Sequence, residues 1–412
     1  MAGKQFRSAV LAGLALVGAG GSAAAQRTER SSVDSSGAQA TGASSSVSLS
    51  ADGRFVVFTS DAANLVANDR NLSSDLFVRD RLTGVTSLVS TDANGNQADD
   101  ASFTFSREAI SDDGRFVGFT SDASNLVPGT LSRGDRVYVK DLQTGAIDLV
   151  SVDSAGNEAD LTSDLDAISA DGRFVVFDSP ATNLVAGDTN GAVDVFVRDR
   201  STGATERVSV DSSGGEGDDD SERPCISADG VRVAFTGIAD DLVAGDGNGW
   251  PDVFVRNRST GFTERVRVDT AGGDADAPSF DCVISADGRF VGFASFADDL
   301  VSGDTNADED VFVRGPWLTL EVVPALALAG SPLTFMTWTG QPSGATLLVT
   351  TAINGAPRFD PLISGSFDAA GKWVFSATVP GGLAGIVVTF ATLGIVPPGK
   401  VAISASRDVS FQ

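Results

Sequence analysis

The chain has 412 residues, and its hydrophobic content of 42% is enough for a sizeable core. Its formal net charge of −26 argues against nucleic-acid binding, which needs a basic face against the phosphates. It contains no histidine, which excludes Ser-His-Asp and Cys-His catalysis and zinc sites with histidine ligands.

Residues 1–25 have the pattern of a secretory signal peptide. Lys4 and Arg7 precede a short apolar run at 9–20, and three alanines at 23–25 offer a cleavage site. A membrane-spanning helix needs about 18 apolar residues in succession, and no stretch reaches that length. We therefore expect a mature protein that is not inserted in a membrane and lies outside the cytoplasm, in the periplasm or the medium.

Residues 26–315 consist of a sequence repeat. A Ser-x-Asp-Gly motif recurs five times, with its glycines at 53, 114, 172, 230 and 288. An alternating apolar run such as Arg173–Phe177 follows each motif, and a second run such as Asp194–Val197 follows a polar loop. A Thr-Gly turn and a third run such as Thr205–Val210 end the unit. Each unit predicts a short inner strand and three longer strands, which together are typical of a propeller blade. The sequence thus predicts an all-β fold with a five-bladed β-propeller.

The fifth repeat ends near Gly315 without its last strand. The missing sequence stands at the other end of the repeat region, because Thr28–Gly37 matches Thr205–Gly214. We therefore expect the N-terminal strand to complete the last blade and close the ring. Such closure removes the exposed sheet edges of a linear array.

The repeated pattern resembles that of the TolB-type propeller family. Ile-Ser-Ala-Asp-Gly-Arg-Phe-Val-Val-Phe at 168–177 and Asp-Val-Phe-Val-Arg-Asp at 194–199 carry the resemblance. The family usually has proline where this chain has Ala170, Ala228 and Ala286, and a count of five differs from its six-bladed members. The resemblance implies a non-catalytic interaction platform with a protein or glycan partner. A carboxylate-based enzyme of the glycosidase or lyase type, with its site at the propeller funnel, is the alternative, and a purely structural envelope protein is a third.

Residues 316–412 differ in composition from the repeats. Alanine, leucine, threonine and valine dominate, and Gly and Pro turns separate short apolar runs such as Leu333–Trp338 and Trp373–Val379. This pattern predicts a C-terminal β-sandwich. A structural appendage and an attachment or carbohydrate-contact module are the two interpretations.

The loop before the third strand carries Asp-x-Asn-x-x-x-Asp in four of the five repeats. Carboxylate and amide oxygens are the ligands that Ca²⁺ prefers, whereas Asp and Asn also form turns with their own backbone. The candidate Ca²⁺ ligands are Asp69, Asn71 and Asp75; Asp188, Asn190 and Asp194; Asp246, Asn248 and Asp252; and Asp304, Asn306, Asp308 and Asp310. In the second repeat, Gly129 and Leu131 fill the first two positions, and the third strand is expected to begin at Asp135.

Two further sets of residues leave questions open. The only cysteines, Cys225 and Cys282, fall on the inner strands of the fourth and fifth repeats. Their positions relative to the turn glycines differ by one residue, which points them to opposite faces unless a bulge intervenes, so a disulfide stays open. Basic residues that recur in the third strand are expected to pair with aspartates of neighbouring blades, and an anion-binding central surface is the alternative; they are Arg79, Lys140, Arg198, Arg256 and Arg314.

No acid stands out by its spacing, so the sequence assigns no catalytic and no cofactor-binding residue. The second repeat is the least regular, at Thr130–Arg133 and at Tyr138, the only tyrosine. An enzymatic site would be sought there first.

Overall fold

The computed structural model describes residues 28–315 except 107, 130–133, 267–272 and 307, and the backbone of six strands between 334 and 403. The predicted signal peptide lies outside the described residues. The described residues form strands and turns and contain no helix. Accordingly, no helix among them is long and apolar enough to cross a membrane. The prediction of an all-β chain is confirmed.

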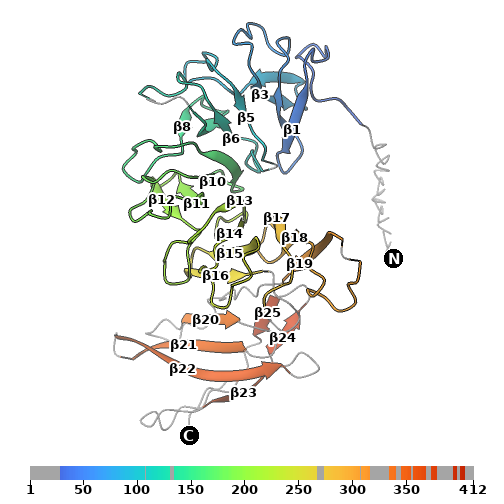
Figure 1. Cartoon of the computed structure of the whole chain (residues 1–412). Coiled ribbons are helices and arrows are strands. Elements are labelled where there is room, and N and C mark those ends of the chain that lie inside the picture. The colour runs from blue at the N-terminus through green and yellow to red at the C-terminus, as the bar shows by residue number, and fades with distance from the viewer. Residues whose placement is uncertain are drawn as a thin grey trace, which may run out of the picture. The chain divides into compact units, whose positions relative to one another are not determined.

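The repeats fold into five successive antiparallel sheets (Figure 1), each with its strands in chain order. Sheet 1 holds β1 (Ser44–Leu49), β2 (Phe55–Ser60), β3 (Asp75–Asp80) and β4 (Val85–Leu88). Sheet 2 holds β5 (Ser102–Phe103), β6 (Phe116–Ser121), β7 (Arg136–Asp141) and β8 (Ile147–Leu149). Sheet 3 holds β9 (Asp164–Ile168), β10 (Phe174–Ser179), β11 (Asp194–Asp199) and β12 (Ala204–Arg207). Sheet 4 holds β13 (Ser221–Ile226), β14 (Arg232–Gly237), β15 (Asp252–Asn257) and β16 (Phe262–Arg265). Sheet 5 has three strands, β17 (Ser279–Ile284), β18 (Val291–Ser295) and β19 (Asp310–Arg314). Four-stranded antiparallel sheets in succession are typical of propeller blades.

The core lies within and between successive sheets. In each sheet an aromatic ring of the second strand stacks on one of the third, as Phe58 does on Phe77 with ring centroids 5.8 Å apart. The third strand also covers the next sheet, because Leu76 of sheet 1 belongs to the same apolar cluster as Phe119 of sheet 2. Tyr138 stacks on Phe119 at 5.7 Å and is fully buried. The irregular Tyr138 is therefore a core residue.

The Ser-x-Asp-Gly motif forms the turn between the first two strands. In sheet 1 the Ser50 hydroxyl and the Arg54 amide both donate to Asp52 Oδ1, at 2.7 and 2.9 Å. The glycine is needed because its φ is positive and because the next sheet approaches it closely. A Cβ added at Gly114 (φ 73°) would lie 2.1 Å from the ring of Phe55 in the preceding sheet. The motif thus locks each turn against its neighbour.

The recurring basic residues of the third strand do connect neighbouring sheets, but the predicted acceptor is wrong. Nη1 of Arg198 donates to the carbonyl oxygen of Asp153 in the preceding unit at 2.9 Å, and to Thr205 Oγ1 at 2.9 Å. Arg79 and Arg256 make the equivalent contacts with Asp34 and Asp211. The backbone of the aspartate accepts the bond because the carboxylate is used within its own turn, where Asp153 Oδ1 binds two backbone amides.

The predicted closing strand stays a prediction. Residues 28–31 are described and lie in no strand, and among the described strands β19 pairs with β18 alone. The segment that follows packs on sheet 1, where Thr86 Oγ1 donates to the carbonyl of Val33 at 2.5 Å. Thr205 in sheet 3 makes the same bond to Val152. The N-terminal segment therefore supplies sheet 1 with the hairpin that sheets 3 and 4 receive from the unit before them.

The C-terminal strands form two antiparallel sheets. One contains β20 (Thr334–Thr339), β21 (Ala345–Ile353), β22 (Ala356–Phe367) and β23 (Trp373–Ala377). The other contains β24 (Leu393–Val396) and β25 (Lys400–Ile403). The side chains that would pack a sandwich lie outside the described residues, so the β-sandwich stays a prediction.

Candidate functional site

The inner strand of sheets 1, 3, 4 and 5 carries a β-bulge at the same place. In sheet 1 the pairing of β1 with β2 shifts between Ser45 and Ser48, and φ of Ser46 is 53°. Sheets 4 and 5 repeat the distortion, with φ of 53° at Arg223 and 54° at Asp281. A bulge turns side chains away from the regular alternation of a strand and is common beside functional sites.

The residues at this bulge differ between repeats that are otherwise similar. The three consecutive positions are Ser45-Ser46-Val47 in sheet 1, Phe103-Thr104-Phe105 in sheet 2, Asp164-Leu165-Asp166 in sheet 3, Glu222-Arg223-Pro224 in sheet 4 and Phe280-Asp281-Cys282 in sheet 5. A serine precedes each set, and Ser-x-Asp-Gly follows it a few residues later. Sheets 1 and 2 are thus neutral here, whereas sheets 3 to 5 carry charge.

The charged side chains of sheets 3 to 5 lie close to one another. Asp164 on β9 stands directly opposite Asp178 on β10. The amide of Arg223 on β13 donates to Asp178 Oδ2 at 3.4 Å. The Arg223 guanidinium pairs with Asp281 on β17 at 3.2 Å. The inner strands therefore join five acids and one arginine into one cluster, the inner acidic cluster: Asp164, Asp166, Asp178, Glu222, Arg223 and Asp281.

Burial makes ionisation of the cluster's less exposed carboxyl groups, Asp166 and Asp178, unfavourable. It raises the pKa of Asp178 to about 7, and the negative charge of Asp164 adds to the effect. Burial also raises the pKa of Asp166 well above its usual value, with Asp178 and Asp164 as further causes. Oδ2 of Asp166 is buried and accepts no hydrogen bond within the described part of the chain. Several carboxyl groups with raised pKa values in one cluster mark a candidate functional site.

Glu108 adds a further acid beside the cluster. Its carbonyl accepts a hydrogen bond from the Ile168 amide at 2.9 Å, which joins sheet 2 to β9. Burial raises the pKa of Glu108 to about 7, and the charge of Asp112 contributes. The Cys282 thiol, burial and, to a lesser extent, the Glu108 charge raise the pKa of Cys225.

The inner strands of sheets 1 and 2 form a different surface. A pocket of about 250 Å³ lies between them, lined among others by Ser45, Ser46, Thr104, Phe103 and Phe105. Phe105 is 79% exposed, and its ring lies 5.2 Å from that of Phe103. Hydroxyl groups and exposed rings replace the charges of the inner acidic cluster.

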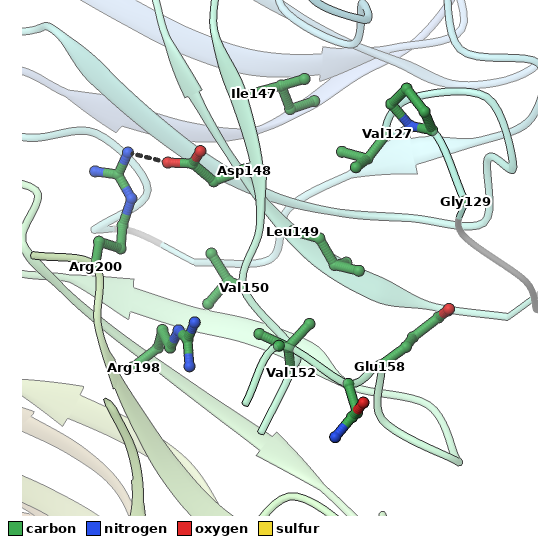
Figure 2. Close-up of a pocket in the computed structure, with 13 residues that line it drawn as sticks. Val127, Gly129, Ile147, Asp148, Leu149, Val150, Val152, Glu158, Arg198 and Arg200 are labelled. Carbon is green, nitrogen blue, oxygen red and sulfur yellow. Dashed lines mark hydrogen bonds and ion pairs between the residues drawn. The ribbon is translucent and has the colours of Figure 1, made fainter. Parts of the chain in front are cut away.

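A larger cavity of about 780 Å³ lies between sheets 2 and 3 (Figure 2). Apolar side chains such as Ile147 and Leu149 line it, and Arg200 pairs with Asp148 at 2.6 Å. Arg198 at its wall already donates to two carbonyl oxygens and a hydroxyl. Among the described residues that line the cavity, every charged side chain already has an ion-pair or hydrogen-bond partner.

The candidate Ca²⁺ loops of sheets 3 and 4 surround an arginine. Nη1 of Arg207 lies 3.5 Å from Asp188, 2.8 Å from Asp194 and 2.9 Å from Glu216. Arg265 lies in the same way 2.8 Å from Asp246 and 3.3 Å from Asp252. The guanidinium is placed between the acids, where a bound cation would be expected. Asn190 and Asn248 form Asx turns, because their Oδ1 atoms accept the amides of Ala192 and Trp250.

The loops of sheets 1 and 2 use other groups. In sheet 1, Gln97 Nε2 donates to both Asp69 and Asp75 at 2.8 Å, and Asn71 Oδ1 accepts the Ser73 amide. In sheet 2 the expected alignment is wrong by one residue, because β7 begins at Arg136 and Asp135 precedes it. Arg136 replaces the buried aspartate and pairs with Glu158 at 2.8 Å.

The loop of sheet 5 contains the same acids without such a partner. Asn306 Nδ2 donates to Asp310 Oδ2 at 3.0 Å, and the Asp308 amide donates to Asn306 Oδ1 at 3.1 Å. Among the described residues, no arginine forms an ion pair with Asp304 or Asp310. No group of three or more acidic or thiol side chains in the described residues is arranged to hold a metal ion.

Comparison with known proteins gives matches of structure alone. No family model and no curated protein sequence matches the chain. It is similar to a solved structure titled putative TolB from Agrobacterium tumefaciens, with 14% identity, a TM-score of 0.38, and coverage of 78% of this chain and 81% of that one. It is also similar to the β-propeller domain of the Trilobed protease from Pyrococcus furiosus, with 11% identity, a TM-score of 0.40, and coverage of 82% and 91%. An oligogalacturonate lyase in complex with manganese gives 12% identity and a TM-score of 0.36, with coverage of 81% and 70%. The chain is similar to TolB-like and other β-propeller proteins.

The sequence predictions missed the inner acidic cluster. Residues that recur in every repeat serve turns and loops. The cluster consists of residues that differ between repeats at equivalent positions of the first two strands, such as Asp178, where sheets 1, 2 and 4 have Thr59, Thr120 and Thr236. An alignment of the five repeats was the signal that could have found it.

Proposed function

We propose that this chain is a non-catalytic binding protein that acts outside the cytoplasm and holds a basic segment of a protein partner on the inner strands of sheets 3 to 5. The observation that carries the proposal is the inner acidic cluster, where five acids and one arginine meet at positions that break the repeat. The net charge of −26 adds a long-range attraction for a basic partner.

Electrostatics explain why a cationic partner would be favoured. The carboxyls of Asp166 and Asp178 have raised pKa values because burial and the negative charges of neighbouring acids oppose their ionisation. A lysine or arginine of the partner removes that repulsion and lets both groups ionise. Binding near neutral pH should therefore release protons from the protein.

The test is calorimetric titration of the protein with a Lys- and Arg-rich peptide in buffers of different ionisation enthalpy. We expect binding that weakens as salt rises, with net release of protons. Replacing Asp164→Asn and Asp178→Thr together should weaken binding at least about tenfold and abolish most of the proton release. The control removes the same charge from exposed loops, through Asp219→Asn and Asp240→Asn.

Two outcomes would overturn the proposal. One is the absence of binding at low salt. The other is an equal loss of affinity in the two double variants, because the attraction would then come from net charge and not from the inner acidic cluster.

A carboxylate-based enzyme is the second candidate. Asp164 and Asp178 stand opposite each other, and the raised pKa of Asp178 allows one protonated and one ionised carboxyl at neutral pH. Glycosidases use such a pair as acid and base. The test is hydrolysis or elimination of a polysaccharide. Activity that is lost in the Asp164→Asn and Asp178→Thr double variant and persists in the control would make the protein an enzyme that acts on a glycan, and not a protein-binding platform.

We also propose that the repeats form a five-bladed ring closed by the N-terminal strand, followed by a β-sandwich from 316 to 412. Val311 and Val313 on β19 are 81% and 70% exposed, whereas the matching Leu76 and Val78 on β3 are 0% and 6% exposed. Leu76 and Val78 are covered by the next sheet. Closure would cover the two valines in the same way.

The sequence repeat also indicates which cation neutralises the acids in the loop of sheet 5. Thr28-Glu29-Arg30 matches Thr205-Glu206-Arg207, so Arg30 corresponds to the arginine that neutralises the loop of sheet 3. We propose that Arg30 fills this role for Asp304 and Asp310 when the ring closes. Ca²⁺ is the alternative occupant of this loop.

A further inference from the structure

The two cysteines meet at the junction of sheets 4 and 5. Cys225 on β13 and Cys282 on β17 have their sulfur atoms 3.8 Å apart, and each residue is 8% exposed. They belong to one apolar cluster with Val253 and Phe293. No other cysteine occurs in the chain.

Bulges in both strands explain how two offset positions come together. Cys225 follows the bulge of β13 and pairs with Ala234, whereas Cys282 lies within the bulge of β17, between the paired residues Phe280 and Val283. On regular strands, a one-residue offset would turn the side chains to opposite faces. The bulge cancels that offset.

We propose that Cys225 and Cys282 form a disulfide that joins sheets 4 and 5. It forms by thiol–disulfide exchange with an oxidant that contains an S–S bond, either a small-molecule disulfide or an oxidised thiol–disulfide oxidoreductase. The thiolate of Cys282 attacks one sulfur of the oxidant, forms a mixed disulfide and expels the first thiol. The sulfur of Cys225, once deprotonated, attacks the Cys282 sulfur and expels the second thiol. The cysteines lose two protons and two electrons, and the S–S bond of the oxidant is reduced to two thiols.

The order of the two steps follows from the surroundings of the sulfurs. The neighbouring thiol and burial raise the pKa of Cys225, so only a small fraction of this sulfur is present as the reactive thiolate. The Cys282 thiol is directed towards the carbonyl oxygen of Arg223, at 3.6 Å. The sulfur of Cys225 needs only a short movement to reach bonding distance, about 2.05 Å, from that of Cys282.

The disulfide would attach sheet 5, the sheet with the fewest strands among the five repeats, to sheet 4. Sheet 5 has three strands, and its contacts with sheet 4 run through β17. The disulfide would tie residues 57 positions apart and so restrict the unfolded chain. It would also hold Arg223 and Asp281, which lie next to the cysteines and contribute to the inner acidic cluster.

The experiment counts thiols in the full chain exported to an oxidising compartment. The protein is denatured and treated with a thiol reagent before and after reduction, and peptides are mapped by mass spectrometry. We expect no reactive thiol before reduction, two after it, and one cross-linked peptide that contains both cysteines. The same result should follow when reduced protein is incubated with oxidised glutathione.

Stability provides a second readout with a matched variant. Cys225→Ala with Cys282→Val restores the residues that sheets 3 and 1 have at these positions, Ala167 and Val47. The oxidised protein should melt about 5 °C or more above both the reduced protein and this variant. Two reactive thiols after oxidation, a separate adduct on each cysteine, or a melting temperature that reductant does not change would each overturn the proposal. The thiol count decides the question even if the variant does not fold.

Discussion

Sheet 3 contains two acidic regions that differ in how their charge is balanced. In the loop, Asp188, Asp194 and Glu216 all lie within 3.5 Å of Arg207. On the inner strand, Asp164 and Asp166 lie beside Asp178 of the second strand, and no arginine or lysine of the described residues forms an ion pair with these three carboxyls. Burial raises pKa values in both regions, to about 6 at Asp188 and about 7 at Asp178. The loop cluster recurs in sheet 4 with Arg265, whereas the inner acidic cluster has no equivalent in sheets 1 and 2.

The two clusters indicate different roles, one in folding and one in function. A balanced cluster that repeats in register is a device for holding a loop on its sheet. An unbalanced cluster reduces stability and so needs another reason to exist, such as a ligand that supplies the missing charge.

The largest effect is expected when the loop cluster loses its cation. Arg207→Leu leaves Asp194, which is 1% exposed, and Asp188 without a counterion. We expect a loss of about 3–5 kcal/mol of unfolding free energy, measured by urea denaturation. Replacement of the exposed Arg70 by Leu should cost about 0–1 kcal/mol.

Sheet 1 supplies the matched rescue for this variant. There Leu88 occupies the position of Arg207, and Gln97 donates to both loop aspartates in place of Glu216. Arg207→Leu with Glu216→Gln should therefore recover part of the loss, because it reproduces a combination that the chain already uses. A double variant no more stable than the single one would show that the loop clusters are not interchangeable.

A moderate effect is expected at the incomplete loop of sheet 5. If Arg30 is its cation, Arg30→Leu should cost about 1–3 kcal/mol, and millimolar Ca²⁺ should leave the melting temperature of the unmodified protein unchanged. In the Arg30→Leu variant, Ca²⁺ should restore part of the loss, since a ligand of the folded state stabilises it.

Calcium makes the opposite prediction for the unmodified protein. A melting temperature that rises with Ca²⁺ and falls with EDTA, and no longer responds after Asp304→Ala and Asn306→Ala, would assign the loop to the metal. Arg30→Leu would then have little effect.

The sequence predicted the parts of the fold that depend on local pattern. Four strands per unit, the Asp-Gly turn and the buried faces follow from alternation and turn chemistry, which act over a few residues. Side-chain partners across sheets depend on register, and a shift of one residue changes them. The sequence alone gave Asp135 as the first residue of its strand, although Arg136 begins it and pairs with Glu158.

Local sequence pattern could not predict the candidate site, for a related reason. The bulges let Cys225 meet Cys282, but no composition rule marks a bulge. The acids of the loops were visible because they recur, and recurrence selected residues that hold the repeat together.

The smallest effect is expected from returning one acid of the inner cluster to the residue of the other sheets. Asp178→Thr gives sheet 3 the residue of sheets 1, 2 and 4. The pKa of Asp178 is raised from 3.8 to about 7 in the folded protein, so the folded state holds this proton more tightly than the unfolded chain does. Stability should thus fall as pH rises from about 4 to 7, and threonine should remove that part of the fall.

Above pH 7 the Asp178→Thr variant should be more stable than the unmodified protein by on the order of 1 kcal/mol, and near pH 4 the gain should vanish. Melting temperatures across this range measure both. Other acids whose pKa values burial also raises, such as Glu108, Asp166, Asp188 and Asp246, should leave a weaker slope in the variant. The curve of melting temperature against pH for Asp219→Asn, on an exposed loop, should run parallel to that of the unmodified protein. If the curve for Asp178→Thr also ran parallel, the folded protein would not oppose ionisation of Asp178, and the case for a cationic partner would lose its physical basis.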